Sequence, residues 1–304
     1  MASCDLQHIP TPSDFHDLYS TYISNIAFNS VLSFIAIALN AATILAIRKT
    51  SSIPRSLKTL LLNLAVSDLG VGALVQPFYV SLLVKWSRSQ TSYPDCMVFQ
   101  VLTIVIAFFS EASFFGVVAI SVDRFLAIHL HLRYQELVTH KRIVVAVISI
   151  WLLSALFSSM PFWSPVSINY AIFTTIGVTC LLVTAIAYFR IYLTLKRHRN
   201  QIRDLQVQQV AQNRNMVNFS SLRNSALGVF YVYLMFLACC SPSWIVLAAR
   251  SVLGPTIALK KFAIISWTLF FLNSSLNPVI YCWKMKHIRR GLISTLQGIV
   301  PARQ

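Results

Sequence analysis

Seven long runs of apolar residues constrain this chain of 304 residues more than any other feature. Each run is about as long as the helix of ~20 residues that crosses a hydrocarbon core of ~30 Å. Lipid offers the backbone no hydrogen-bond partners, so only helices and closed barrels span it, and continuous apolar runs exclude a barrel. The predicted spans are Ile23–Ile47, Thr59–Val84, Met97–Ile128, Ile143–Phe162, Ser167–Leu195, Ser225–Ala249 and Phe262–Trp283. We therefore predict an all-α membrane protein, a bundle of seven transmembrane helices.

The composition supports a lipid environment and argues against a nucleic-acid partner. Hydrophobic residues make up 56% of the chain and charged residues 11%, whereas about a quarter of a typical soluble protein is charged. The net charge of +16 comes from basic residues at the ends of the spans, where they do not form the stripe that binds nucleic acid. Attraction to the anionic inner leaflet accounts for this charge, so the bilayer is the predicted partner.

The basic residues also predict the orientation of the chain. With the N-terminus outside, most of the 25 Lys and Arg residues fall on the cytoplasmic side, as the positive-inside rule requires. The outer side carries only Lys85, Arg88, Arg250, Lys260 and Lys261. We predict an extracellular N-terminus over residues 1–22, a seven-helix domain over 23–283 and a cytoplasmic tail over 284–304, in the plasma membrane.

The tail has the pattern of a short eighth helix. Ile288, Leu292 and Ile293 recur at helical spacing among basic residues such as Arg289 and Arg290. An amphipathic helix of this kind lies in the plane of a membrane surface. We expect it on the inner leaflet.

Polar side chains inside the predicted spans are costly in lipid, and each is therefore a functional hypothesis. A lone Asn or Ser could simply bond to a neighbouring helix, so the interpretation depends on the whole set. These residues are Asn40, Asn63, Asp68, Glu111, Ser113, Asp123, Arg124, Asn273, Ser274 and Asn277.

Several of them stand in motifs that resemble the rhodopsin-like family of G-protein-coupled receptors. The motifs are Asn63-Leu64-Ala65-Val66-Ser67-Asp68-Leu69, Asp123-Arg124-Phe125, Trp151, and Asn277-Pro278-Val279-Ile280-Tyr281. They occur in the order and in the spans that the family shows, over nearly the whole chain. The resemblance implies a receptor that passes the signal of an extracellular ligand to heterotrimeric G proteins, and not an enzyme.

The resemblance assigns one group of residues to activation and G-protein coupling. Arg124 would face the G protein after its release from Asp123, and Phe125 stands where the family usually has Tyr. Leu222 and Arg223 occupy the region where many members have an acidic partner for the arginine, so we expect no such latch and a raised basal activity. The coupling set is Asp123, Arg124, Phe125, Leu132, Tyr188, Phe236, Pro242, Asn277, Pro278 and Tyr281.

A second group matches the family's sodium site. One carboxylate with hydroxyl and amide oxygens suits a hard cation, which prefers oxygen ligands. The matching residues are Asp68, Ser113, Asn273, Ser274 and Asn277. No cofactor is expected apart from this sodium ion.

The ligand pocket is expected to be mostly apolar and aromatic, with a few orienting polar groups. Ile106 replaces the aspartate of amine receptors, and Phe271 replaces the lysine that binds retinal in opsins. A small apolar molecule, a lipid or a short peptide remains open as the ligand, and Glu111 remains open as a ligand contact or a structural group. The predicted lining is Gln76, Gln100, Ile106, Ser110, Glu111, Ile172, Phe173, Ser243, Trp244, Trp267 and Phe270.

Three departures from the family pattern concern cysteine and proline. Cys240 stands where the helix-six motif has Trp, and Cys180 replaces the usual proline of helix five. The short second extracellular loop has no cysteine, so Cys4 and Cys96 either pair with each other or stay free thiols. A short loop without the standard disulfide resembles the melanocortin, lysophospholipid, cannabinoid and adenosine receptors.

Two other classes of function fit the sequence less well than a receptor does. An intramembrane zinc enzyme needs histidines and carboxylates grouped within the helices, but the histidines here fall in termini, loops and helix ends. A transporter with a sodium site at Asp68 is the alternative, although transporters usually show internal repeats and interrupted helices.

Overall fold

The computed structural model describes residues 14–51, 53–88, 96–130, 133–164, 166–205, 213–254, 256–285 and 288–293. Its elements are α1 (Phe15–Lys49), α2 (Arg55–Gly70), the π-helical turn η3 (Val71–Val75), α3 (Gln76–Arg88), α4 (Cys96–Leu130), α5 (Tyr134–Leu137), α6 (His140–Ser158), the 3-10 turn η5 (Met160–Phe162), α7 (Val166–Leu205), α8 (Asn213–Leu253) and α9 (Ile257–Lys284). Seven of the helical segments are long and apolar enough to cross a membrane, with α2, η3 and α3 forming one of them. The predicted seven-helix bundle is confirmed.

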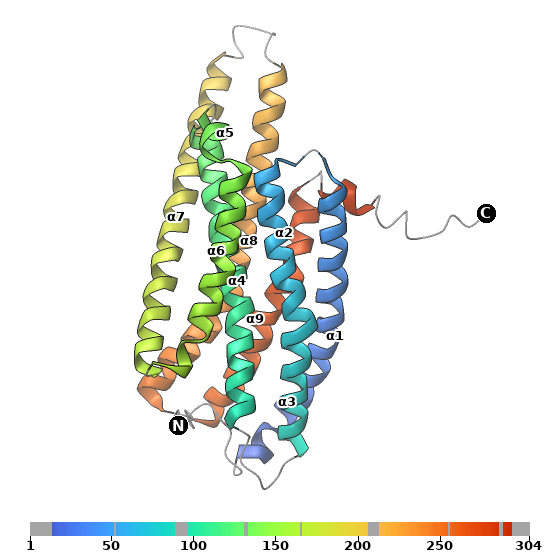
Figure 1. The fold of residues 1–304 in the computed structure, drawn as a ribbon, viewed down its shortest axis with the longest axis vertical. Coiled ribbons are helices and arrows are strands. Elements are labelled where there is room, and N and C mark those ends of the chain that lie inside the picture. Colours follow the sequence, from blue (N-terminus) through green and yellow to red (C-terminus); the bar gives the residue numbers. More distant parts are fainter. Residues whose placement is uncertain are drawn as a thin grey trace, which may run out of the picture.

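The helices run side by side along the long axis of the molecule, and α7 and α8 extend past the others at one end (Figure 1). We call this the Arg124 end, because α4 reaches it near Arg124, and we call the opposite end the Trp86 end. The outward surfaces of the helices are apolar: Phe34 on α1 is 75% exposed and Leu152 on α6 is 66% exposed. Such side chains suit contact with lipid, where apolar surface needs no cover.

The buried apolar side chains form two clusters. The cluster at the Arg124 end includes Leu64, Val117 and Ile280, and the cluster at the Trp86 end includes Val71, Phe271 and Tyr79. On α2 and α9 the two clusters are separated by one or two helical turns that carry buried polar residues. Those turns place the polar layer described below in the middle of the bundle.

The first helix begins eight residues earlier than predicted, at Phe15. Asp14, His16 and Asp17 lie at this end of the helix, and ionisable residues are rare within membrane spans. However, Phe15, Leu18 and Tyr22 lie on one helical face and are 7%, 0% and 0% exposed, packed into the cluster at the Trp86 end. Asp14 adds an ion pair to Lys260 near the start of α9, at 2.5 Å.

The fifth and sixth spans also extend further than predicted. The polar stretch Lys196–Arg223 was expected to be a connection between helices, but α7 continues to Leu205 and α8 begins at Asn213. Apolar periodicity marks only the part of a helix that meets lipid or protein, so it could not show these extensions beyond the apolar runs.

The π-helical turn η3 follows from Pro77. The backbone N–H of Gln76 bonds to the carbonyl of Val71, and Pro77 has no N–H to continue the pattern. The carbonyl of Gly72 accepts instead from Ser33 Oγ on α1, at 2.7 Å. A Cβ at Gly72 would lie 3.0 Å from that of Ala36, so the glycine also permits this close approach of α1.

Gly70, immediately before η3, should not tolerate a side chain. A Cβ there would lie 2.1 Å from Cε1 of Phe109, and that ring packs against Phe108 and Trp151. We expect Gly70→Ala to destabilise the protein by ~1–3 kcal/mol, the usual cost of overpacking. Thermal unfolding of the purified protein measures this, and Phe109→Leu should recover part of the loss in the double variant. An additive double-variant cycle would contradict the contact.

Candidate functional site

The polar layer in the middle of the bundle is centred on Asp68, which is fully buried on α2. Asn277 Nδ2 donates to Asp68 Oδ2 at 2.8 Å, and Ser113 Oγ donates to Oδ1 at 3.4 Å. Ser274 also lies within hydrogen-bonding reach of the carboxylate. Residues from α2, α4 and α9 therefore meet at one buried carboxylate.

The chemistry of this layer fits a hard monovalent cation. The oxygen atoms that could coordinate a cation belong to the Asp68 carboxylate, the hydroxyls of Ser113 and Ser274, and the amides of Asn273 and Asn277. The Oδ1 atoms of both asparagines are buried and have no hydrogen-bond partner within the described part of the chain. All the available donor atoms are oxygens, which hard cations prefer, and no group of three or more His, Cys, Asp or Glu side chains gathers among the described residues to favour a transition metal.

A row of amides on α1 links this helix to α9. Asn40 Nδ2 donates to the carbonyl of Ser274 at 2.9 Å, next to the Asp68 layer. Closer to the Trp86 end, Asn29 Nδ2 donates to Thr268 Oγ1 at 2.8 Å, and that hydroxyl donates to Asn25 Oδ1 at 2.6 Å. Asn25 and Asn29 had no role in the sequence analysis, and their spacing of four residues on one face was the signal available.

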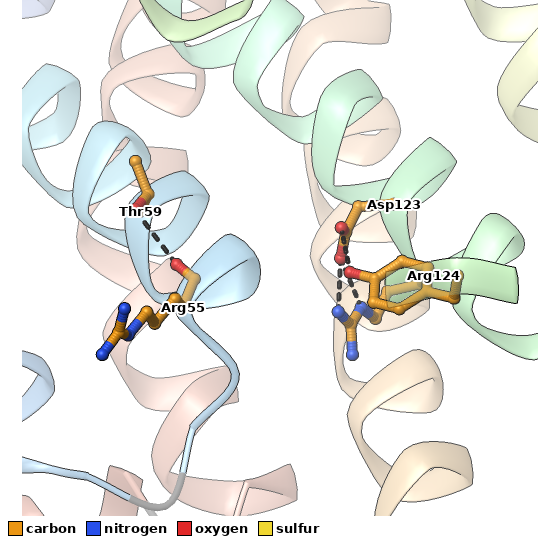
Figure 2. Close-up of polar contacts among 5 residues, drawn as sticks. Arg55, Thr59, Asp123 and Arg124 are labelled. Carbon is orange, nitrogen blue, oxygen red and sulfur yellow. Dashed lines mark hydrogen bonds and ion pairs between the residues drawn. The ribbon is translucent and has the colours of Figure 1, made fainter. Parts of the chain in front are cut away.

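At the Arg124 end, Arg124 is buried beside Asp123, and both residues are on α4 (Figure 2). Arg124 Nε donates to Asp123 Oδ2 at 2.9 Å, and Nη2 forms a second, very short contact with the same oxygen. Arg124 is 2% exposed and Asp123 is 3% exposed. An arginine this deeply buried needs a paired carboxylate, because an unpaired buried charge is expensive.

Tyr134 of α5 completes this site and was missed by the sequence analysis. Its hydroxyl donates to Asp123 Oδ1 at 2.6 Å and also contacts Ser56 on α2. Burial, with the adjacent Asp123 carboxylate, raises the pKa of Tyr134 to about 12, so the tyrosine remains a donor at neutral pH. Nothing in the local sequence could reveal this contact, since it depends on how the chain folds back after α4.

The other described residues predicted for coupling lie on α4, α7, α8 and α9. Tyr188 on α7 shares a hydrogen bond of 2.9 Å with Ser121, while the hydroxyl of Tyr281 on α9 is buried without a partner among the described residues. Phe236 stacks on Phe114, with ring centroids 5.3 Å apart. Pro242 and Pro278 lie inside α8 and α9, and Phe125 stacks on His129.

The predicted ligand residues converge only in part. Gln76, Ile106, Trp267 and Phe270 belong to or border the cluster at the Trp86 end. Gln76 is fully buried, and neither polar atom of its amide has a partner among the described residues. Orphaned buried amides are costly, so this side chain is a candidate polar contact for a ligand.

The remaining predicted pocket residues are more scattered. The Ser110 hydroxyl bonds to the carbonyl of Ile106, and Ser243 Oγ and Glu111 Oε2 are buried without partners in the described structure. Trp244 is 42% exposed, and its ring lies over Gly177 on α7. Gln100 and Ile172 are half-buried.

Some predictions fall on parts of the chain that the structure does not describe. Leu132 and Cys4 lie outside the described residues, and so do the side chains of Cys96, Phe173, Leu222 and Arg223. The Cys4–Cys96 pairing and the missing latch therefore stay predictions. The cysteines that the structure describes as free are Cys180, Cys239, Cys240 and Cys282.

Cys240 is buried at 5% exposure in the cluster at the Arg124 end. Phe270 packs against both clusters, so an aromatic ring already lies between them. We expect Cys240→Trp to overpack this region, at ~1–3 kcal/mol, and to lower surface expression or shift basal activity. Surface labelling and basal signalling measure this, with Cys240→Ala as the control that removes the thiol without adding volume. Normal expression with unchanged basal signalling would show that the space is vacant.

Comparisons with known proteins agree on one family. The sequence profile described as 7 transmembrane receptor (rhodopsin family) matches residues 39–281. The chain belongs to the rhodopsin family of seven-transmembrane receptors. It is therefore a receptor and not an enzyme, and nothing in these comparisons supports the transporter alternative.

Individual relatives of this receptor span several ligand classes. It is 30% identical to adenosine receptor A2b of Gallus gallus, over 47% of this chain and 39% of that one. It is 25% identical to the histamine H2 receptor of Cavia porcellus, over 83% and 73%. It is 26% identical to dopamine receptor 1 of Drosophila melanogaster, over 86% and 60%.

The fold also resembles that of a solved rhodopsin structure. The structure of squid rhodopsin superposes with a TM-score of 0.76 at 18% identity, covering 94% of this chain and 88% of that one. The relatives do not single out the adenosine receptors, because the histamine H2 receptor and dopamine receptor 1 match over more of the chain. The family makes this a multi-pass membrane protein.

Proposed function

We propose that this receptor lies in the plasma membrane with its N-terminus outside and passes the signal of an extracellular ligand to a heterotrimeric G protein. The Trp86 end would then face outward and the Arg124 end the cytoplasm. The distribution of basic residues supports this orientation. The observation that carries the function is the buried Asp123–Arg124 pair, held by Tyr134 at the end of the bundle where a cytoplasmic partner would bind.

The ion pair between Asp123 and Arg124 could be broken without separating two helices. Both charges are on one helix, and the described residues supply one further donor to Asp123, from Tyr134. Rearrangement of α5 or of the helices around it would expose a guanidinium with several N–H donors. Exposed arginine at the cytoplasmic mouth is the group that a G protein would contact.

We propose further that Asp68, Ser113, Asn273, Ser274 and Asn277 hold a sodium ion. A bound cation would supply the positive charge that balances the buried carboxylate. Because the layer joins α2, α4 and α9, and Asn40 ties α1 to the same point of α9, occupancy would couple to the packing of four helices.

For the ligand, we propose a neutral or weakly charged molecule: a small apolar compound, a lipid or a short peptide. The histamine and dopamine receptors among the relatives are named for amines, whereas this receptor has Ile106 at the position where amine receptors keep a carboxylate. Trp267, Phe270 and the Gln76 amide offer aromatic contacts and hydrogen bonds without a formal charge.

The test is a screen of cells that express the receptor, with dissociation of the G-protein subunits as the signal. The panel should contain the three proposed ligand classes and a set of biogenic amines. We expect activation by a member of the three classes and none by amines. Hits should lose potency in Gln76→Leu and keep it in the matched variant Gln135→Leu, on the exposed surface of α5. An amine agonist that tolerates Gln76→Leu would overturn the ligand proposal.

A further inference from the structure

The helices α8 and α9 form the most extensive helix pair of the described structure. At the Arg124 end their packing depends on Gly228 of α8, which is buried. A Cβ at this position would lie 3.2 Å from Cβ of Lys284 and 3.2 Å from Cε of Met285. The glycine therefore lets the last turn of α9 approach α8 closely, and it places the root of the Lys284 side chain against that helix.

The Lys284 side chain ends over two aromatic rings. Its Nζ lies 4.3 Å from the ring centroid of Tyr231 on α8 and 3.5 Å from the ring centroid of Trp283 on α9. The centroids of the two rings are 5.3 Å apart. A cation within ~6 Å of an aromatic centroid is attracted to the ring, so one ammonium group joins a ring of α8 to a ring of α9. We call Tyr231, Trp283 and Lys284 the Lys284 clamp.

No carboxylate competes with the rings for this ammonium in the part of the chain that the structure describes. The ion pairs there join Arg124 to Asp123 and Lys260 to Asp14. Lys284 is half-buried, and a cation that is partly shielded from water gains more from an aromatic ring than an exposed one does. The two rings are therefore the partners that hold the end of the Lys284 side chain.

The chain around Lys284 is anchored on the α9 side. Met285 follows it and is 7% exposed, in the same buried cluster as Ile288 and Leu292 of the helical segment 288–293. That segment keeps its basic residues on the exposed side, which confirms the predicted amphipathic eighth helix for the residues that the structure describes. With the end of α9 fixed in this way, a change at the clamp requires movement of α8.

The α8 side of the clamp belongs to a part of the helix that can bend. Pro242 lies inside α8, about three turns from Tyr231, and a proline removes a backbone hydrogen bond and permits a kink. Phe230, next to Tyr231, packs on the Tyr188 ring of α7, with centroids 4.9 Å apart. A bend at Pro242 that moves this part of α8 away from the bundle would separate Tyr231 from the Lys284 ammonium.

We propose that the Lys284 clamp holds the Arg124-end half of α8 against α9 in the resting receptor and so limits basal G-protein coupling. Its effect on coupling rests on the function proposed above, whereas its effect on the position of α8 does not. Trp283 and Lys284 are neighbours on α9 and stay together when α8 moves, so displacement costs the contact with Tyr231 alone. The clamp joins α8 to α9, unlike the acidic latch to Arg124 of α4 that we expect to be missing.

The position of α8 can be measured in the purified receptor without a G protein. Nitroxide labels are introduced as unnatural amino acids at two exposed positions, Leu227 on α8 and Arg55 on α2, and electron paramagnetic resonance gives the distribution of distances between them. We expect Lys284→Met to raise the population with displaced α8 roughly two- to fivefold, the factor that one cation–π contact contributes. Tyr231→Leu should act similarly, and the double variant should exceed neither single variant, because both remove the same contact.

Matched variants separate the clamp from other roles of these side chains. Lys284→Arg keeps a cation that stacks on aromatic rings, and Tyr231→Phe keeps the ring, so both should retain the wild-type distances. Lys49→Met makes the same exchange at the last residue of α1, where the lysine is exposed. It tests whether the effect comes only from lysines that reach toward the membrane surface. Thermal unfolding shows that each variant is folded, and if Lys284→Met is not, the pair Tyr231→Leu and Tyr231→Phe makes the same test.

Basal dissociation of G-protein subunits, normalised to surface receptor, should rise in Lys284→Met and Tyr231→Leu by the same factor as the displaced population. A shift in distances without coupling in any variant would support the clamp and contradict the proposed function. Unchanged distances in Lys284→Met and Tyr231→Leu would refute the clamp. An equal shift in Lys49→Met would refute it too, and so would additive effects in the double variant.

Discussion

Replacing Arg124 with alanine is expected to leave the receptor at the cell surface and to abolish G-protein coupling. The guanidinium is the only group in this part of the described structure that is both strongly cationic and buried, at 2% exposure. Its removal takes away the group that we propose the G protein contacts. Agonist-independent and agonist-driven dissociation of G-protein subunits, normalised to surface receptor, measures the loss.

The variant also leaves Asp123 with Tyr134 as its remaining donor among the described contacts. An uncompensated buried charge can cost about 3–5 kcal/mol, so low expression of Arg124→Ala would have a structural cause. Asp123→Asn/Arg124→Ala removes that charge and keeps the test valid, and Arg190→Ala on the exposed surface of α7 is the matched control. Full coupling in the double variant at equal surface expression would refute the proposed role of Arg124.

The seven-helix bundle could be predicted from the sequence because a helix that crosses a bilayer needs a long run of apolar residues. Apolar runs predicted where each helix meets lipid, and the resemblance to the receptor family predicted which intramembrane polar residues belong to one group. Asp68, Ser113 and Asn277 lie on three helices that are distant in sequence, yet they meet within hydrogen-bonding distance. The resemblance to rhodopsin-like receptors was what assigned these residues to one group, and the cost of an isolated charge at that depth agrees with it.

The features that were missed depend on contacts that no local pattern encodes. Tyr134 reaches Asp123 only because the chain turns back into α5 after α4. The start of α1 at Phe15 was not predicted from the sequence, where Asp14 and Asp17 lie at this end of the helix. The spacing of Phe15, Leu18 and Tyr22 was nevertheless that of one helical face. Pro77 could have suggested an irregular helix, but the π-helical form of η3 depends on Ser33 taking the Gly72 carbonyl.

The Trp86 end was the least predictable region for a related reason. The residues that contact a ligand depend on the chemistry of that ligand. Lipid contact and helix packing therefore do not predict which residues these are. The burial of Gln76 without a partner among the described residues depends on how the helices pack, which no local pattern encodes. Trp244 was predicted to line the pocket from its position on the sixth span, and the structure places its ring over Gly177.

Sodium should stabilise the wild-type receptor, and Asp68→Asn should remove that effect. The carboxylate is fully buried and provides the one formal negative charge of the polar layer, so an amide in its place would bind a cation far more weakly. A ligand that binds only the folded state at ten times its Kd stabilises it by about 1.4 kcal/mol. Thermal unfolding of the purified receptor in sodium, against choline at equal ionic strength, measures the shift, and basal signalling measures its consequence.

Glu111→Gln provides the matched control, because it makes the same exchange of carboxylate for amide at a half-buried intramembrane residue of α4. We expect this variant to keep the wild-type response to sodium, since Glu111 makes no described contact with Asp68. Asn277→Ala removes the closest donor to the Asp68 carboxylate, at 2.8 Å, and should weaken the sodium response without abolishing it. If sodium and choline give the same stability and the same basal signalling in the wild type, Asp68 is a structural residue that only joins α2 to α4 and α9.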